Sequence, residues 1–161
     1  MAITNGYCTL SEIKAFVNIS DSNDDNELED AVNSASRQID AYCGRQFYAD
    51  GAATAKVYRT RNPYQVTVDD ISTSTGLVLK YDDDDDGTFE TTVASTGFIL
   101  LPLNGERFGI DNLGFTSIEL LSDGPHEFPT THTNNRPRIE VTANWGFPAV
   151  PEPVRQACLM L

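Results

Sequence analysis

The sequence has few basic residues and no long apolar run. Its 161 residues include 11 lysines and arginines against 24 aspartates and glutamates, giving a formal net charge of −13. A field of this sign repels nucleic acid and anionic lipid, so a DNA-reading or membrane-surface role is disfavoured. Apolar runs span only a few residues, and Met1–Cys8 lacks the basic and apolar regions of a signal peptide. We therefore expect a protein made in the cytoplasm.

Signatures of catalysis are missing as well. There is no Gly-x-Ser-x-Gly motif and no glycine-rich phosphate loop. Cys8, Cys43 and Cys158 are widely spaced, without a metal-ligand pattern, and are typical of small apolar side chains in a reducing compartment. We expect no enzyme activity.

The two histidines are the remaining candidates for a site of this kind. His126 and His132 lie in a Gly/Pro/Thr-rich stretch with Glu127 between them. A six-residue separation is not a recognised zinc spacing, so this stretch is predicted to be a surface loop.

Helical patterns occupy the N-terminal part. Thr9 and Glu12 form a capping box that predicts a helix over about 10–17. An acidic stretch then opens a helix over about 25–43, ended by Gly44 at its C′ position. One apolar stripe follows this second helix: Leu28, Val32, Ala35, Ile39 and Tyr42.

The central part has a different pattern, with short β-type runs separated by Gly, Asp, Asn, Ser and Pro. Alternating apolar residues near Ile139 indicate a sheet with one wet face. The predicted strands are Ala55–Arg61, Tyr64–Val68, Leu77–Tyr81, Phe89–Val93, Phe98–Leu101, Thr116–Leu121 and Arg138–Asn144.

A third helix is predicted after Pro151 and Pro153, because proline is tolerated in a first helical turn. Its end is apolar on nearly every side, which indicates burial, and no stop signal follows Leu161. We expect this end to be covered by a partner or the helix to continue.

Helices at both ends with strands between them predict an α+β fold, in which terminal helices pack as a small bundle around a mostly antiparallel β insertion. The expected parts of this one composite domain are an N-terminal helical part (1–46), a β-rich insertion (47–147) and the start of the C-terminal helix (148–161).

The sharpest local motif is Asp82–Gly87, whose alternate carboxylates Asp82, Asp84 and Asp86 match the opening of a calcium loop. The twelfth position is Val93 instead of a bidentate Glu, and Glu90 is the nearby substitute. Two interpretations stay open: a polar hairpin tip, or a weak site for Ca²⁺ or another cation.

Basic residues gather in one place, at Arg45, Lys56, Arg59 and Arg61. They either pair with the protein's own carboxylates or contact an acidic neighbour. On the second interpretation Arg45, Arg59 and Arg61 are candidate contacts to another subunit.

Three motifs in order resemble the gp6-like head-to-tail connector (adaptor) proteins of long-tailed bacteriophages. They occur near the start, in the second helix and around the predicted third helix. The motifs are Tyr7–Lys14 (YCTLSEIK), Ala35–Phe47 (ASRQIDAYCGRQF) and Glu140–Glu152 (EVTANWGFPAVPE) followed by Val154–Ala157 (VRQA).

The resemblance implies a structural virion protein at the neck, the head-tail interface. It would form a ring, typically of twelve copies, under the portal protein, extend the DNA channel without sequence-specific binding, and dock the stopper or tail terminator. The family uses its C-terminal segment to grip the portal, and that segment is expected beyond Leu161. Arg155 and Leu161, in the predicted third helix, join the candidate subunit or partner contacts. The alternative is a small cation-dependent binding module that uses Asp82–Asp86.

Overall fold

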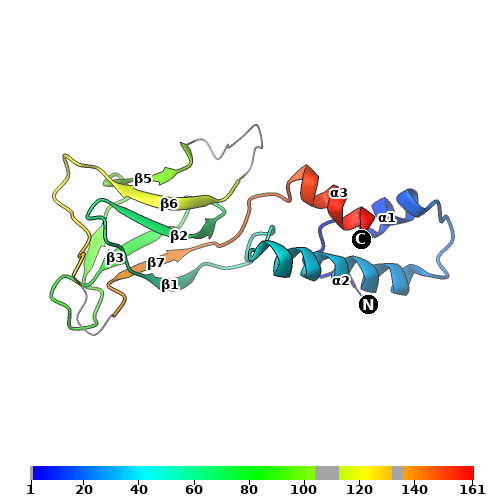
Figure 1. Cartoon of the computed structure of the whole chain (residues 1–161), viewed down its shortest axis with the longest axis horizontal. Coiled ribbons are helices and arrows are strands. Elements are labelled where there is room, and N and C mark those ends of the chain that lie inside the picture. The colour runs from blue at the N-terminus through cyan, green and yellow to red at the C-terminus, as the bar shows by residue number, and fades with distance from the viewer. Residues whose placement is uncertain (1, 104–112, 132–135) are drawn as a thin grey trace. The chain divides into compact units, whose positions relative to one another are not determined.

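A computed structural model describes residues 2–103, 113–131 and 136–161, in which three helices and seven strands form two compact units (Figure 1). The helical unit comprises Met1–Tyr48 and Ala149–Leu161, and the β unit comprises Ala49–Pro148. The predicted α+β class is confirmed. That the parts act as one composite domain stays a prediction. Within the described ranges, the helices are too short or too polar to cross a membrane.

Helix α1, Leu10–Val17, begins at the predicted capping box. The Glu12 backbone N–H donates to Thr9 Oγ1 at 3.2 Å, and the Thr9 N–H donates to Glu12 Oε2 at 2.7 Å. These two bonds satisfy amide donors that the first helical turn leaves free. The helix ends at Asn18, whose φ of 60° is left-handed.

Helix α2, Asp25–Cys43, matches its predicted range and ends at Gly44, where φ is 65°. Val32, Ala35 and Ile39 of the predicted stripe are buried. Tyr42 is not: its side chain is 94% exposed, so the C-terminal end of the apolar stripe is not covered in the single chain.

Helix α3, Glu152–Met160, follows Pro151 and packs against α1 and α2. Cys158 and Leu159 are buried, whereas Met160 and Leu161 are 70% and 75% exposed. Within the described chain α3 meets its neighbours along one face, so coverage of Met160 and Leu161 by a partner or by further helix stays a prediction.

The β unit holds two antiparallel sheets, one of four strands in the order β1-β7-β3-β4 and one of three in the order β2-β6-β5. Each predicted strand overlaps an observed one. The strands are β1 Thr54–Tyr58, β2 Gln65–Ile71, β3 Val78–Tyr81, β4 Thr91–Val93, β5 Phe98–Leu101, β6 Phe115–Leu120 and β7 Ile139–Ala143.

The two sheets share one apolar core. Residues such as Val66 and Ile118 of one sheet and Leu79 and Val141 of the other are fully buried in it, together with Trp145. On β7, Ile139, Val141 and Ala143 are buried while the residues between them are half-buried, as the alternation predicts.

Candidate functional site

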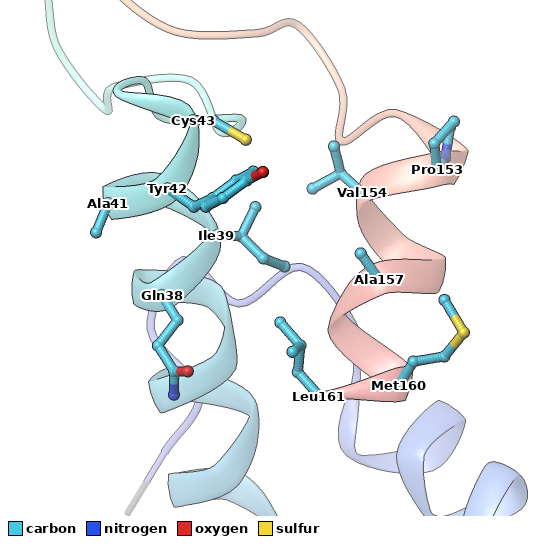
Figure 2. Close-up of a pocket in the computed structure, with 10 residues that line it drawn as sticks. All are labelled: Gln38, Ile39, Ala41, Tyr42, Cys43, Pro153, Val154, Ala157, Met160 and Leu161. Atoms are coloured by element: carbon cyan, nitrogen blue, oxygen red, sulfur yellow. The ribbon is translucent and has the colours of Figure 1, made fainter.

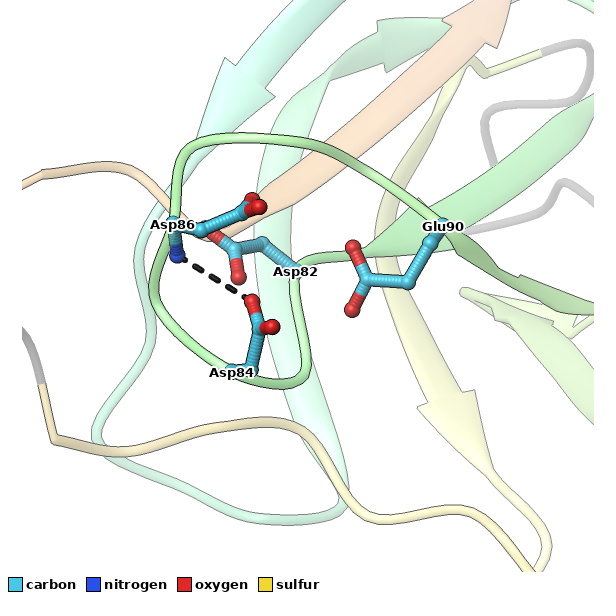
Figure 3. A group of neighbouring side chains, drawn as sticks. All are labelled: Asp82, Asp84, Asp86 and Glu90. Carbon is cyan, nitrogen blue, oxygen red and sulfur yellow. Dashed lines mark hydrogen bonds between the residues drawn. The ribbon is translucent and has the colours of Figure 1, made fainter.

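The acidic loop between β3 and β4 gathers four carboxylates (Figure 3). One carboxylate oxygen from each of Asp82, Asp84, Asp86 and Glu90 lies within 4.8 Å of the others. Asp82 is buried, and the other three are exposed. The structure thus brings together the three sequence-predicted residues and the nearby Glu90.

Asp82 organises the backbone of this loop. Its two carboxylate oxygens accept hydrogen bonds from the N–H groups of Asp85 (2.6 Å) and Gly87 (2.8 Å). Asp84 and Asp86 each accept from the N–H two residues further on, at 3.2 and 2.7 Å. Such bonds are typical of Asx turns, so the interpretation as a polar hairpin tip is sufficient to explain the conformation of the loop. Cation binding here stays a prediction.

Arg138 is the site residue that sequence reasoning missed. Its side chain is 6% exposed, and its guanidinium donates to the carbonyl oxygens of Asp82, Asp83 and Thr131 at 2.8–3.1 Å. It also lies 4.0 Å from an Asp82 carboxylate oxygen and 3.7 Å from one of Asp85. A buried positive charge therefore offsets part of the negative charge of the loop.

The basic cluster is divided by the fold. Arg45 follows α2 in the helical unit, whereas Arg59 and Arg61 follow β1 in the β unit, and all three are exposed. Lys56 pairs with Asp69 at 2.7 Å and lies over the Trp145 ring at 4.5 Å. For Lys56 the interpretation as an internal ion pair is thus sufficient. Contact of the three arginines with another subunit stays a prediction.

The stretch that contains His126 and Glu127 makes contacts with tyrosines of the β unit. His126 Nδ1 lies 3.2 Å from the Tyr81 hydroxyl, and the Tyr64 hydroxyl donates to Glu127 at 2.6 Å. His132 lies outside the described residues. These contacts agree with the surface loop that the sequence predicts.

An apolar groove of about 770 Å³ runs between α2 and α3 (Figure 2). The Tyr42 ring points from α2 towards α3 across it. None of the residues that line it carries a charge, in a chain that has 24 acids. The lining residues are Gln38, Ile39, Ala41, Tyr42, Cys43, Pro153, Val154, Ala157, Met160 and Leu161.

The two predicted C-terminal contact residues lie in different settings. Leu161 lines the groove, whereas Arg155 pairs with Glu152 at 2.5 Å and with Glu12 at 3.0 Å. The hydrogen bonds from Arg155 and Gln156 lower the pKa of Glu152 to about 2. Arg155 thus joins α3 to α1, and its contact with a partner stays a prediction.

The residues of the family-like motifs meet inside the helical unit. The Tyr7 hydroxyl donates to the Asp40 carboxylate and accepts from the Phe47 N–H at 2.7 Å, while the Tyr7 N–H donates to Ser36 Oγ at 3.0 Å. Burial of Tyr7 raises the pKa of its phenol, and the bond to Asp40 adds to the effect. The first two motifs are thus parts of one packed structure.

Comparisons with known proteins bear on the same segment. The profile of the family described as phage gp6-like head-tail connector protein matches residues 7–78, which include α1, α2, β1 and β2. No curated protein matches the chain.

Two solved structures have a similar fold. A chain from the neck of an empty gene transfer agent (GTA) particle, computed with C6 symmetry, is 17% identical with a TM-score of 0.57. A chain from the virion of the native GTA particle is 16% identical with a TM-score of 0.51. Each alignment covers 99% of this chain and 80% of the other. The resemblance indicated by the sequence motifs is confirmed over residues 7–78, where the chain matches the profile of the phage gp6-like head-tail connector family.

Proposed function

We propose that the chain is a structural connector in the neck of a phage or phage-like particle and carries out no catalysis. The observation that carries this proposal is the connector-family match, which spans the N-terminal part of the helical unit and extends into the β unit. The likeness to chains of a GTA neck and virion, over 99% of this chain, supports it.

In this role the chain forms a ring, of twelve copies on the family's pattern, that lies under the portal protein and extends the DNA channel. The C6 symmetry with which the similar neck was computed supports repeated copies around an axis. The net charge of −13 per copy suits a channel wall along which DNA moves without adhering. The remaining partner is the stopper or tail terminator, which binds the side of the ring away from the portal.

The α2/α3 groove is our candidate for the contact between neighbouring copies. A closed ring repeats one head-to-tail contact, so each copy must present a surface that another copy covers. The groove is apolar, open and uncharged, whereas the chain as a whole carries a net charge of −13. Because this surface is uncharged, two identical acidic chains can meet there without repulsion between like charges at the contact.

The test places a charge in the groove with Tyr42→Lys, because the Tyr42 ring points across the groove towards α3 (Figure 2) and is 94% exposed in the single chain. We expect this variant to lose ring assembly in native mass spectrometry and sedimentation, with and without portal protein, because burying an unpaired ammonium is costly. Ala31→Lys is the control, since it adds the same charge at an exposed position of the same helix outside the groove. Intact rings of Tyr42→Lys would refute the contact. Rings that form but fail to bind portal would assign the groove to the portal instead.

A second candidate function, a cation-dependent binding module, is favoured by one observation, the convergence of Asp82, Asp84, Asp86 and Glu90. Calorimetry with Ca²⁺ tests it. Tight binding that the double variant Asp84→Asn, Asp86→Asn abolishes would support the module. An absence of heat would leave the connector role alone.

A further inference from the structure

Two buried cysteines meet in the helical unit. Cys8, just before α1, and Cys158, in α3, place their Sγ atoms 3.3 Å apart although 150 positions separate them in sequence. Both are free thiols, and each residue is less than 5% exposed. Cys43, by contrast, is an exposed free thiol.

The pair lies where three segments join. Ser36 Oγ of α2 is 3.6 Å from Cys158 Sγ, and the same oxygen accepts from the Tyr7 N–H. A covalent bond between the sulfurs would therefore fix α3 to the segment before α1, beside α2.

We propose that Cys8 and Cys158 are an oxidative modification site, forming an intramolecular disulfide that locks α3 in place. A disulfide has an S–S length of about 2.0 Å, so the sulfurs must approach by roughly 1.3 Å. Because one partner precedes α1 and the other lies in α3, the bond would close a loop that contains the whole β unit.

The oxidant is a low-molecular-weight disulfide such as oxidised glutathione. One protein thiolate attacks a sulfur of the oxidant, which releases one small thiol and leaves a mixed disulfide. The second protein thiolate then displaces the second small thiol. The two protein thiols lose two protons and two electrons, and the oxidant is reduced to two thiols.

The closed structure makes this reaction slow. Burial, together with the contact to Cys158, raises the pKa of the Cys8 thiol to about 12. The thiolate is the nucleophile, so reaction requires α3 to open first. The thiols thus stay reduced in the cytosol. If the proposed virion role is right, the disulfide forms after the particle leaves that compartment.

The test uses the purified chain with Cys43→Ser, which removes the exposed competing thiol. We incubate it with oxidised glutathione in urea below the unfolding midpoint, so that α3 opens. We expect an intact mass lower by two hydrogen atoms and a cross-linked peptide joining residues 8 and 158. The melting temperature should rise on the order of 10 °C, because the bond restricts the unfolded chain. Dithiothreitol should reverse both changes.

Cys43→Ser combined with Cys158→Ser is the matched control, and it should show neither the mass loss nor the rise. An unchanged mass, or a stable glutathione adduct on the Cys43→Ser chain, would overturn the proposal. None of these readouts involves ring assembly, so failure here leaves the connector role standing, and a failure to form rings leaves this proposal standing.

Discussion

At the scale of single residues, Arg138 explains how five consecutive aspartates adopt an ordered loop. Its guanidinium makes four hydrogen bonds to three backbone carbonyls, of Asp82, Asp83 and Thr131. A planar fork of donors can serve several acceptors at once, which a lysine ammonium on a flexible stem does not reproduce. The residue that orders the loop is therefore cationic and lies outside it in sequence.

Replacing Arg138 with Met should destabilise the β unit by about 3–5 kcal/mol, because it leaves buried carbonyl groups and the Asp82 carboxylate without their cation. Urea unfolding measures this loss. Arg136→Met is the control, since Arg136 is exposed and donates to the Asp86 carbonyl at the longer distance of 3.3 Å. A loss for Arg138→Met no larger than that of the control would contradict the role given to Arg138.

At the scale of elements, the start of α1 carries a contact that depends on pH. Hydrogen bonds from the backbone and side chain of Thr9, with Arg155 nearby, lower the pKa of Glu12. A carboxyl whose pKa is lower in the folded state contributes stability above its unfolded pKa of about 4.3 and loses it as the pH falls through the folded value. The cap therefore stabilises the helical unit at neutral pH and weakens in acid.

Glu12→Gln should cost about 1 kcal/mol at pH 7, a typical value for a helix cap, and the difference from the parent should shrink as the pH falls below 4. Thermal unfolding followed by circular dichroism at several pH values measures it. Glu27→Gln, at an exposed position in the first turn of α2, is the comparison. A difference between parent and Glu12→Gln that stays constant down to pH 2 would show that the Glu12 charge is not involved.

The elements also show which features the sequence could predict. Helices α1 and α2 and the seven strands could be predicted from caps, periodicity and turn residues. These signals are local, because each lies within the same stretch of sequence as the element it predicts. The exposure of Tyr42 did not follow, because it depends on the open groove that separates the end of α2 from α3. The part played by Arg138 was missed because it depends on the pairing of β3 with β7, between residues far apart in sequence.

At the scale of the whole molecule, the β unit begins and ends at neighbouring strands. β1 and β7, its first and last strands, pair with Thr54 opposite Ala143. The Asp50 N–H donates to the Trp145 carbonyl at 2.8 Å, close to both junctions with the helical unit. The chain therefore leaves and re-enters the helical unit through two segments that lie side by side.

Replacing residues 50–147 with a linker of a few glycines and serines should leave a helical protein, because the linker need only span the short gap between the two junctions. The β unit, residues 49–148, expressed alone should unfold cooperatively, since its apolar core is built from its own strands. Circular dichroism and urea titration test both products. A linker variant without helical signal would mean that the helices depend on the insertion.

The paired junction makes the β unit an exchangeable cassette. A different sheet whose first and last strands are neighbours could be inserted at the same position without changing how the helices pack. Loop lengths and surface charge could then diverge in the cassette while the Tyr7, Asp40 and Phe47 contacts stay fixed. Proteins with this architecture can therefore change the binding surface of the β unit while they preserve the packing of the helical unit.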